Sequence, residues 1–204
     1  MISDTVFLLI TIAVAFAAGA IASVSGFGIG SLLTPLLALR VETKLAVAAV
    51  SVPHFVATAY RFWLLRHQVD RNLLWSFGLM SAAGGLTGAV LSSYAASPVL
   101  SYIFGGLLVF TGFTGLTGLS EKMRFHGIVA WAAGFLSGLL GGLVGNQGGI
   151  RSAAMLGFNA PRDAFIATAT VVGLIVDGAR MPVYLFSQGR NIAALWPVLL
   201  AATL

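Results

Sequence analysis

The sequence predicts an all-α fold, a polytopic bundle of transmembrane helices built as two inverted repeats that each contain a glycine-broken helix pair. Of the 204 residues, 58% are hydrophobic and only 8% are charged, whereas a soluble domain carries about 25% charged residues. Apolar runs reach the roughly 20 residues that a helix needs to cross a bilayer. The sequence lacks the alternating pattern of a membrane β-barrel. Glycine-rich segments interrupt two of the apolar runs at corresponding places.

Charge and cysteine content exclude several other classes of protein. The net charge is +5, but the basic residues lie mostly in short loops between apolar runs, as the positive-inside rule predicts. There is no basic stripe with interleaved aromatic residues, so no nucleic-acid partner is expected. Cysteine is absent, which excludes disulfides and thiolate metal sites. The apolar N-terminus carries Asp4 and no basic residue, so it predicts a first membrane span and not a signal peptide.

Nine helices are expected along the chain, bounded by glycine, proline or polar breaks. Pro98 and Pro161 stand at helix starts, where the missing proline N–H would be unpaired in any case. Pro53 and Pro182 lie inside apolar runs, and membrane helices tolerate such kinks when neighbours satisfy the freed backbone groups. The predicted helices cover residues 4–24, 29–39, 43–65, 72–93, 98–119, 127–143, 149–158, 162–186 and a last run that begins near Asn191.

An internal repeat relates the two glycine-rich segments at an offset of 119 residues, which places Gly26 over Gly145 and Gly30 over Gly149. Each segment follows a long apolar run. Each precedes a short helix, a polar turn and another long apolar run. We therefore predict a first transmembrane repeat over residues 1–119, a cytoplasmic linker over 120–125 and a second repeat, incomplete at its C-terminal end, over 126–204.

Loop charges predict that the second repeat is inverted. The loop with Arg66, His67 and Arg71 is the richest in basic residues, which places it in the cytoplasm. Lys122 and Arg124 lie two spans further on and therefore on the same side. The uncharged loop "SSYAASP", which lies between these two basic loops, falls outside. An odd number of crossings then separates the starts of the two repeats. Inverted repeats with interrupted helices are typical of secondary transporters.

Each glycine-rich break exposes the N-terminus of the short helix that follows it. A helix N-terminus carries unpaired N–H groups and a partial positive charge, and it therefore attracts anions. Two such N-termini from inverted repeats can meet on one anion near the bilayer midplane. The substrate-binding residues predicted around the breaks are Ser25, Gly26, Gly28, Gly30, Ser31, Asn146, Gln147, Gly148, Gly149, Arg151 and Ser152, with Thr34 as a further hydroxyl.

A second interpretation is that the glycines only allow helices to pack closely, as small-xxx-small patterns do. This interpretation is favoured for Gly134, Gly138 and Gly142, which recur every fourth residue along one run. For the two breaks the anion site is favoured, because a short helix follows each of them.

Four ionisable residues fall inside the expected spans, where charge is costly and marks functional sites. Arg151 lies in the first turn of a short helix, where its charge opposes the helix dipole unless an anion is near. The alternative is that it extends toward the membrane surface. Asp177 and Arg180 are three residues apart, and a structural ion pair is favoured over a role in ion coupling. His54 is interpreted as a helix–helix hydrogen-bond partner, with proton relay as the alternative.

No enzyme signature accompanies these residues. Three scattered histidines lack the spacing of a metal site, so no metal is expected. The sequence has no readable catalytic triad and no Walker phosphate loop, and no cofactor is expected.

The segments "SGFGIGSLLTPLLAL" and "GFLSGLLGGLVGNQGG", each followed by a short helix and a polar turn, resemble the TauE/SafE family of sulfite and organosulfur anion exporters, also called the 4-toluene sulfonate uptake permease family. The resemblance covers nearly the whole chain. It implies transport of small anions such as sulfite, sulfonates or sulfonated carboxylates, and about one more helix after Leu204. Asn146, Gln147 and Arg151 depart from it, because the family more often has glycine and apolar residues there.

We therefore predict a secondary transporter of small anions, integral to the plasma (cell inner) membrane as a multi-pass protein and working by alternating access around a midplane site. An anion channel of the same fold and a non-transporting membrane subunit are the alternatives. The expected partners are a small anionic substrate and the lipid bilayer, and a homo-oligomer is left open. Neither the direction of transport nor its ion coupling follows from the sequence.

Overall fold

The computed structural model describes residues 3–119, 125, 127–146, 148–156 and 161–203, and within these ranges it contains helices and no strand. The predicted all-α fold class is confirmed. In chain order the elements are α1 (Asp4–Ser25), α2 (Ile29–Ala38), α3 (Thr43–Leu65), η1 (Arg66–Gln68), α4 (Arg71–Leu73), η2 (Leu74–Gly78), α5 (Leu79–Tyr94), α6 (Ser97–Leu116), α8 (Ile128–Val144), α9 (Gly148–Leu156), α10 (Arg162–Ala194) and α11 (Trp196–Thr203).

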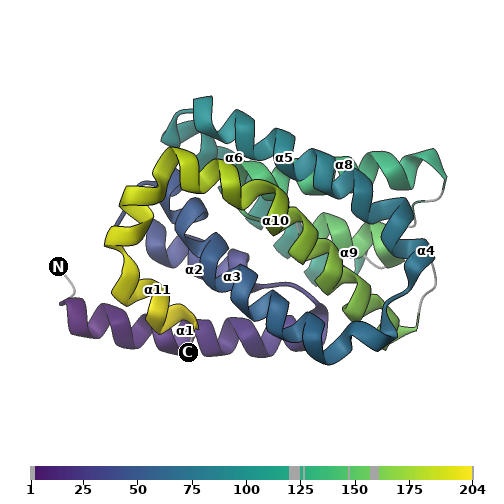
Figure 1. The fold of residues 1–204 in the computed structure, drawn as a ribbon, viewed down its shortest axis with the longest axis horizontal. Helices are drawn as coiled ribbons and strands as arrows, with labels where there is room; N and C mark the ends of the chain where they lie inside the picture. The colour runs from purple at the N-terminus through teal and green to yellow at the C-terminus, as the bar shows by residue number, and fades with distance from the viewer. Residues whose placement is uncertain (1–2, 120–124, 126, 147, 157–160, 204) are drawn as a thin grey trace.

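Four helical segments in the described ranges are long and apolar enough to cross a membrane: α1, α3 with η1, α6 and α10. Helix α10 has 33 residues. At 1.5 Å per residue it extends about 50 Å, well beyond the roughly 30 Å hydrocarbon core of a bilayer. It runs diagonally through the bundle and packs against α3 and α5 (Figure 1). Its middle therefore lies deep inside the protein.

Two helix pairs fold back on themselves from opposite ends of the bundle. Helix α1 starts at the end where the N-terminus lies, and α2 returns to that end (Figure 1). There Arg40 Nη1 donates to Asp4 Oδ1 at 2.8 Å. Helix α8 starts at the other end and α9 turns back toward it. Phe125 just before α8 and Phe165 near the start of α10 pack on one hydrophobic cluster at that end.

Helices α5 and α8 approach so closely that their backbones touch. A Cβ atom added to Gly84 or Gly88 of α5 would overlap the backbone of α8. A Cβ added to Gly138 or Gly142 of α8 would in turn overlap the backbone of α5. The packing role predicted for the glycine stripe of α8 is therefore confirmed.

The predicted helix over residues 72–93 is divided into α4, η2 and α5. The dividing element, η2, is a single π-helical turn over Leu74–Gly78. Such a turn inserts an extra residue into the helix repeat and rotates the helix that follows. Helix α5 follows this turn and packs Gly84 and Gly88 against α8.

The predicted last helix does not begin near Asn191, because α10 continues to Ala194. The polar residues there remain helical, and Asn191 Nδ2 donates to Gln188 Oε1 at 2.9 Å, almost one turn earlier. Helix α11 begins at Trp196, with Pro197 in its first turn, where proline is tolerated.

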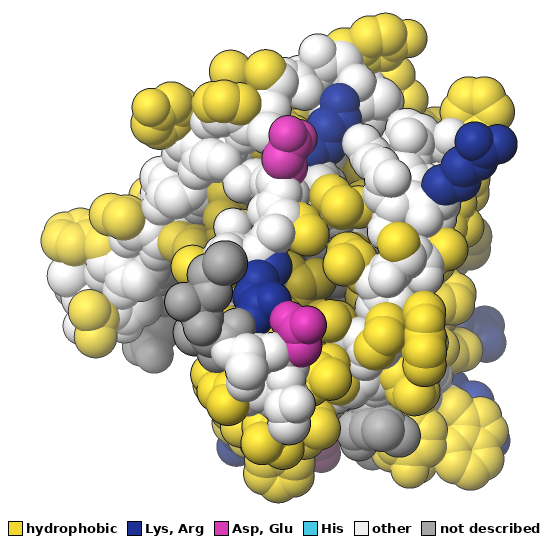
Figure 2. Space-filling model, turned by 90° about the vertical axis from the view of Figure 1, so that its left-hand side faces the viewer, with side chains coloured by type: hydrophobic (Ala, Val, Ile, Leu, Met, Phe, Trp, Pro, Cys, Tyr) yellow, Lys and Arg dark blue, Asp and Glu magenta, His cyan; other side chains and the backbone are white. Residues whose placement is uncertain are grey.

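Large apolar side chains cover the outside of the bundle. Phe16 is 82% exposed and Phe186 is 96% exposed, as expected for a surface that faces lipid rather than water. Figure 2 shows the end of the molecule where the N-terminus lies, with a few acidic and basic side chains among hydrophobic ones. Further ionisable side chains are buried inside the bundle and form the site described next.

Candidate functional site

Glycines turn the chain at the first break, between α1 and α2. Gly26 ends α1 with φ 79°, and its N–H donates to Ala22 O at 2.9 Å. Gly28 precedes α2 with φ 136°. Both values lie in the region that other residues rarely adopt, so glycine is required here. Ser25, one of the predicted ligands, has its Oγ 2.7 Å from Phe27 O and stabilises the turn itself.

The second break, between α8 and α9, has the same local geometry and lies against the first. Gly145 ends α8 with φ 74° and ψ 5°. A Cβ on Gly30 would overlap the carbonyl oxygen of Gly145, and a Cβ on Gly148 would overlap the ring of Phe27. Gly149 lies in the first turn of α9. The two predicted breaks are therefore brought together in the interior.

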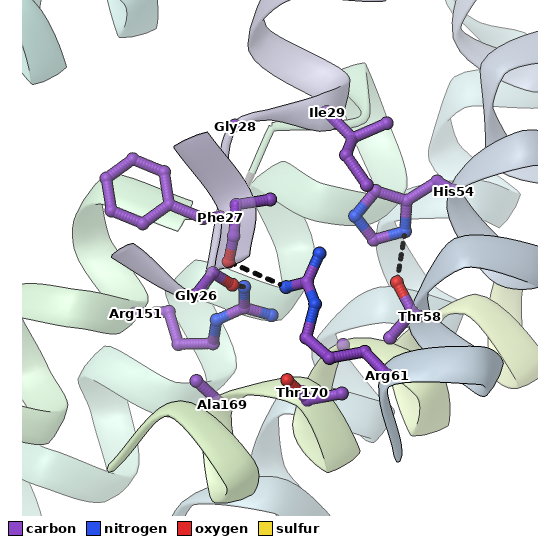
Figure 3. A pocket seen from close by; sticks show the side chains of 12 residues that line it. Gly26, Phe27, Gly28, Ile29, His54, Thr58, Arg61, Arg151, Ala169 and Thr170 are labelled. Atoms are coloured by element: carbon purple, nitrogen blue, oxygen red, sulfur yellow. Dashed lines mark hydrogen bonds between the residues drawn. The ribbon is translucent and has the colours of Figure 1, made fainter. Parts of the chain in front are cut away.

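A small cavity remains between the first break, α3, α9 and α10. Its volume is about 10 Å³, roughly the space that one water molecule needs. Figure 3 shows the polar side chains from α3 and α9 grouped around it, opposite the break. The described lining contains no carboxylate and consists of Ala22, Gly26, Phe27, Gly28, Ile29, His54, Thr58, Arg61, Arg151, Ala169, Thr170 and Gly173.

Arg151 extends into this region from α9 and is only 2% exposed. Its Nη2 donates to Gly26 O at 3.1 Å. Its Nε and Nη1 have no hydrogen-bond partner among the described residues. A Cβ on Gly173 would lie 3.0 Å from Nη1, so this unpaired donor lies at the cavity wall that α10 forms. Arg151 is thus buried in the bundle and does not extend to the membrane surface.

Arg61 of α3 is a cavity residue that the sequence analysis did not single out. Its Nη1 donates to Ala22 O at 2.9 Å, and Figure 3 shows its guanidinium beside that of Arg151. The repeat offers a signal that would have found it. The offset of 119 residues places Arg61 over Arg180, which the sequence predicts to be an intramembrane charge.

The ion pair predicted between Asp177 and Arg180 is present in the interior of α10. Asp177 is fully buried, and its Oδ1 accepts from Arg180 Nε at 3.0 Å and lies 2.7 Å from Arg180 Nη2. Its Oδ2 lies 2.5 Å from His54 Nδ1 of α3. His54 is therefore a helix–helix hydrogen-bond partner, as favoured from the sequence, and its ring also lines the cavity.

Arg61 and Arg180 make the same contact in the two halves of the chain. Arg61 Nη1 donates to Ala22 O, and Arg180 Nη1 donates to Gly141 O. Each of these carbonyls also accepts the N–H of the left-handed glycine that ends its helix. The arginines are 119 residues apart, and so are the two acceptors. One arginine thus binds the last turn before each break.

The remaining predicted ligands lie on the two short helices and at the second break, outside the lining of the cavity. Ser31 Oγ donates to Asn146 Oδ1 at 3.2 Å and joins α2 to the second break. Asn146 Nδ2, Thr34 Oγ1 and Ser152 Oγ are buried without a hydrogen-bond partner among the described residues. Gln147 lies outside the described residues.

The cavity is suited to an anion on electrostatic grounds. Two arginines face it, and the nearby carboxylate of Asp177 is already bound by Arg180 and His54. Arginine N–H groups form short, strong hydrogen bonds with oxyanions. Within the described part of the chain no three His, Asp or Glu side chains come close enough to bind a metal ion.

The fold and this cavity define a helical membrane protein with a buried cationic site. The family model for the sulfite exporter TauE/SafE matches residues 11–204, and the chain belongs to this family. The family consists of membrane transporters of sulfite and related anions, and its members are not enzymes. Comparisons with curated proteins and with solved structures give no significant match.

Proposed function

We propose that the chain is a secondary transporter that carries a small oxyanion, sulfite or a sulfonate, across the cell inner membrane. The observation that carries this proposal is the pair of arginines, Arg61 and Arg151, that face one interior cavity without a carboxylate in its described lining. Membership of the family supports sulfite and related anions as the substrate class.

Charge balance favours an anionic ligand at this place. Burying a cation without a counter-charge costs several kcal/mol. Arg180 is balanced by Asp177, whereas the described residues that line the cavity beside Arg61 and Arg151 include no carboxylate. A sulfite or sulfonate group supplies both a negative charge and three acceptor oxygens for the unpaired Nε and Nη1 of Arg151.

The cavity must widen to admit such a substrate, because about 10 Å³ accommodates only a water molecule. The structure therefore resembles a closed state, between the outward-open and inward-open states of an alternating-access cycle. The glycines of the breaks are suited to this motion, since glycine passes easily between backbone conformations. Inverted repeats, the first over residues 1–119 and the second over 126–204, would exchange roles during the cycle. The recurrent arginine contact at the breaks supports this arrangement.

Counterflow in proteoliposomes tests the proposal. Vesicles loaded with unlabelled sulfite should transiently accumulate radiolabelled sulfite above its external concentration, because a transporter exchanges one bound anion for another. A channel would only equilibrate the label. Arg61→Gln and Arg151→Gln should each lower the initial rate by about tenfold or more, as expected for loss of a charge-assisted hydrogen bond. Arg190→Gln, at an exposed position near the end of α10, is the matched control and should leave the rate unchanged.

Two results would contradict the proposal. One is uptake no faster than in protein-free vesicles for sulfite, methanesulfonate and sulfate alike. The other is an Arg61→Gln, Arg151→Gln double variant that transports as fast as the original protein.

A further inference from the structure

One difference between the two halves of the site lies at a pair of corresponding positions next to the two arginines. The offset of 119 residues that places Arg61 over Arg180 also places Thr58 over Asp177. In both helices the arginine follows three residues after this position, so the two side chains lie on the same helix face. One half therefore contains a carboxylate next to its arginine, and the other half contains a hydroxyl.

The carboxylate half is closed on itself. Both oxygens of Asp177 are bound, Oδ1 by Arg180 and Oδ2 by His54. The remaining Nη1 of Arg180 donates to Gly141 O. Every nitrogen of this guanidinium thus has an acceptor within the protein.

The hydroxyl half is open. Thr58 is 4% exposed and lines the cavity with Arg61. Its Oγ1 lies 3.5 Å from His54 Nδ1, the same nitrogen that contacts Asp177. The unpaired Nη1 of Arg151 is the second cationic group here, since a Cβ on Gly173 would be 3.0 Å from it and 3.6 Å from Thr58 Cγ2.

We infer that Asp177 is a built-in counter-anion for Arg180, and that the substrate supplies the corresponding anion for Arg61. The substrate then binds beside Thr58, at the position that the Asp177 carboxylate occupies in the other half. This inference rests on the proposed function and assigns the site within it. The protein then binds one anion per chain, although it has two arginine half-sites, because the second is permanently occupied. The residue at position 58 decides whether the first half-site is vacant.

The recognised group is accordingly a small oxyanion group, such as the sulfite or sulfonate of the proposed function. Its oxygens accept from Arg61 and Arg151 and from the Thr58 hydroxyl. His54 lies between this anion and the carboxylate of Asp177. Its Nδ1 contacts Thr58 Oγ1 at the binding position and Asp177 Oδ2 on the other side.

Thr58→Asp tests the inference by supplying the missing carboxylate from the chain itself. The new side chain should pair with Arg61 as Asp177 pairs with Arg180. We expect sulfite binding, measured by calorimetry on the purified protein, to weaken by about tenfold or more, because charge repulsion replaces a charge-assisted hydrogen bond. Thr58→Asn, a neutral side chain of the same shape, is the matched control and should weaken binding by clearly less.

Thermal stability in sulfite-free buffer gives a readout that does not depend on the substrate. Thr58→Asp should melt about 3 °C or more above Thr58→Asn, because its carboxylate balances the buried Arg151 and the half-buried Arg61. Thr58→Asp protein that melts below Thr58→Asn, or that does not fold, contradicts the inference. If neither the original protein nor Thr58→Asn binds sulfite or methanesulfonate while Thr58→Asp is still stabilised, the proposed substrate is wrong and the vacant half-site is supported.

The reverse variant, Asp177→Asn, should open the second half-site. We expect it to melt at a lower temperature than the original protein and to recover part of the difference in formate, a carboxylate small enough to replace the lost side chain. Formate should raise the melting temperature of the original protein by less, since only its first half-site is vacant. Equal formate effects on the two proteins would overturn the role assigned to Asp177.

Discussion

Arg151 Nη2 donates to Gly26 O at 3.1 Å, so a side chain of the short helix α9 binds the break between α1 and α2. The two residues are 125 positions apart, and the contact joins the two halves of the chain at the cavity. It leaves Nε and Nη1 of the same guanidinium without a partner among the described residues. Arg151 therefore combines one structural hydrogen bond with two donors for a ligand.

Replacing Arg151 by methionine should separate anion binding from folding. We expect Arg151→Met to weaken sulfite binding by about 10- to 100-fold, the loss of roughly 1.5–3 kcal/mol per hydrogen bond to a charged group. Stability without sulfite should change less than binding, because the lost hydrogen bond to Gly26 O is offset by removal of a buried charge that has no carboxylate beside it in the described cavity lining. Calorimetry and thermal unfolding of the same preparation measure both effects. A large loss of stability with unchanged affinity would assign Arg151 a purely structural role.

Replacing Arg180 should have the opposite profile. Arg180→Met leaves the carboxylate of Asp177 buried with His54 as its remaining partner. Removal of one partner of a buried ion pair costs about 3–5 kcal/mol, which for a chain of this size lowers the melting temperature by roughly 10 °C. The melting temperatures of Arg180→Met and Arg151→Met, measured side by side, test this difference. Equal stability of the two variants would argue against the closed half-site.

An added methyl group at Gly173 should disturb the ligand position from the side of α10. A Cβ there would lie 3.0 Å from Arg151 Nη1, so the guanidinium has to move. We expect Gly173→Ala to weaken sulfite binding by about tenfold, as for one lost charge-assisted hydrogen bond, while the fold is retained. Gly178→Ala is the control on the same helix, because nothing lies within 4 Å of its Cβ position. Equal affinities in the two variants would place the anion elsewhere.

The contact between α5 and α8 predicts a stability effect unrelated to anions. Gly138→Ala should destabilise the protein by about 1–3 kcal/mol, the usual cost of overpacking, because its Cβ overlaps the backbone at Ser81. Gly106→Ala in α6 has open space around the added atom and should be neutral or stabilising by up to about 1 kcal/mol. Thermal unfolding of both variants tests the difference, and a Gly138→Ala protein as stable as Gly106→Ala would contradict the packing.

Most helix boundaries follow from local chemistry and were predictable. Glycines and polar turns end α1, α2 and α8 within one or two residues of the expected positions. The prediction near Asn191 is wrong because polar residues in an apolar run indicate a loop, whereas here their side chains hydrogen-bond along the helix. Tertiary packing of α10, which no local pattern encodes, keeps that segment helical.

The cavity was only partly predictable, for a different reason. Arg151 and the glycines of the first break were identified because charge and glycine are conspicuous in an apolar run. Arg61 lies near the end of a predicted span, where an arginine normally extends to the membrane surface. Its role depends on the position of the Ala22 carbonyl, and therefore on where the tertiary fold places the end of α1 relative to α3.

The glycine contacts between α5 and α8 also limit how the molecule can move. Backbones that touch at four glycines leave no space for side chains between the helices, so we expect the two helices to move together. Because α5 and α8 come from different halves of the chain, this seam is expected to act as a fixed pivot. The opening of the cavity to either side of the membrane would then be confined to the two short helices and the helices packed against them. These would move relative to α5 and α8, which would remain in contact.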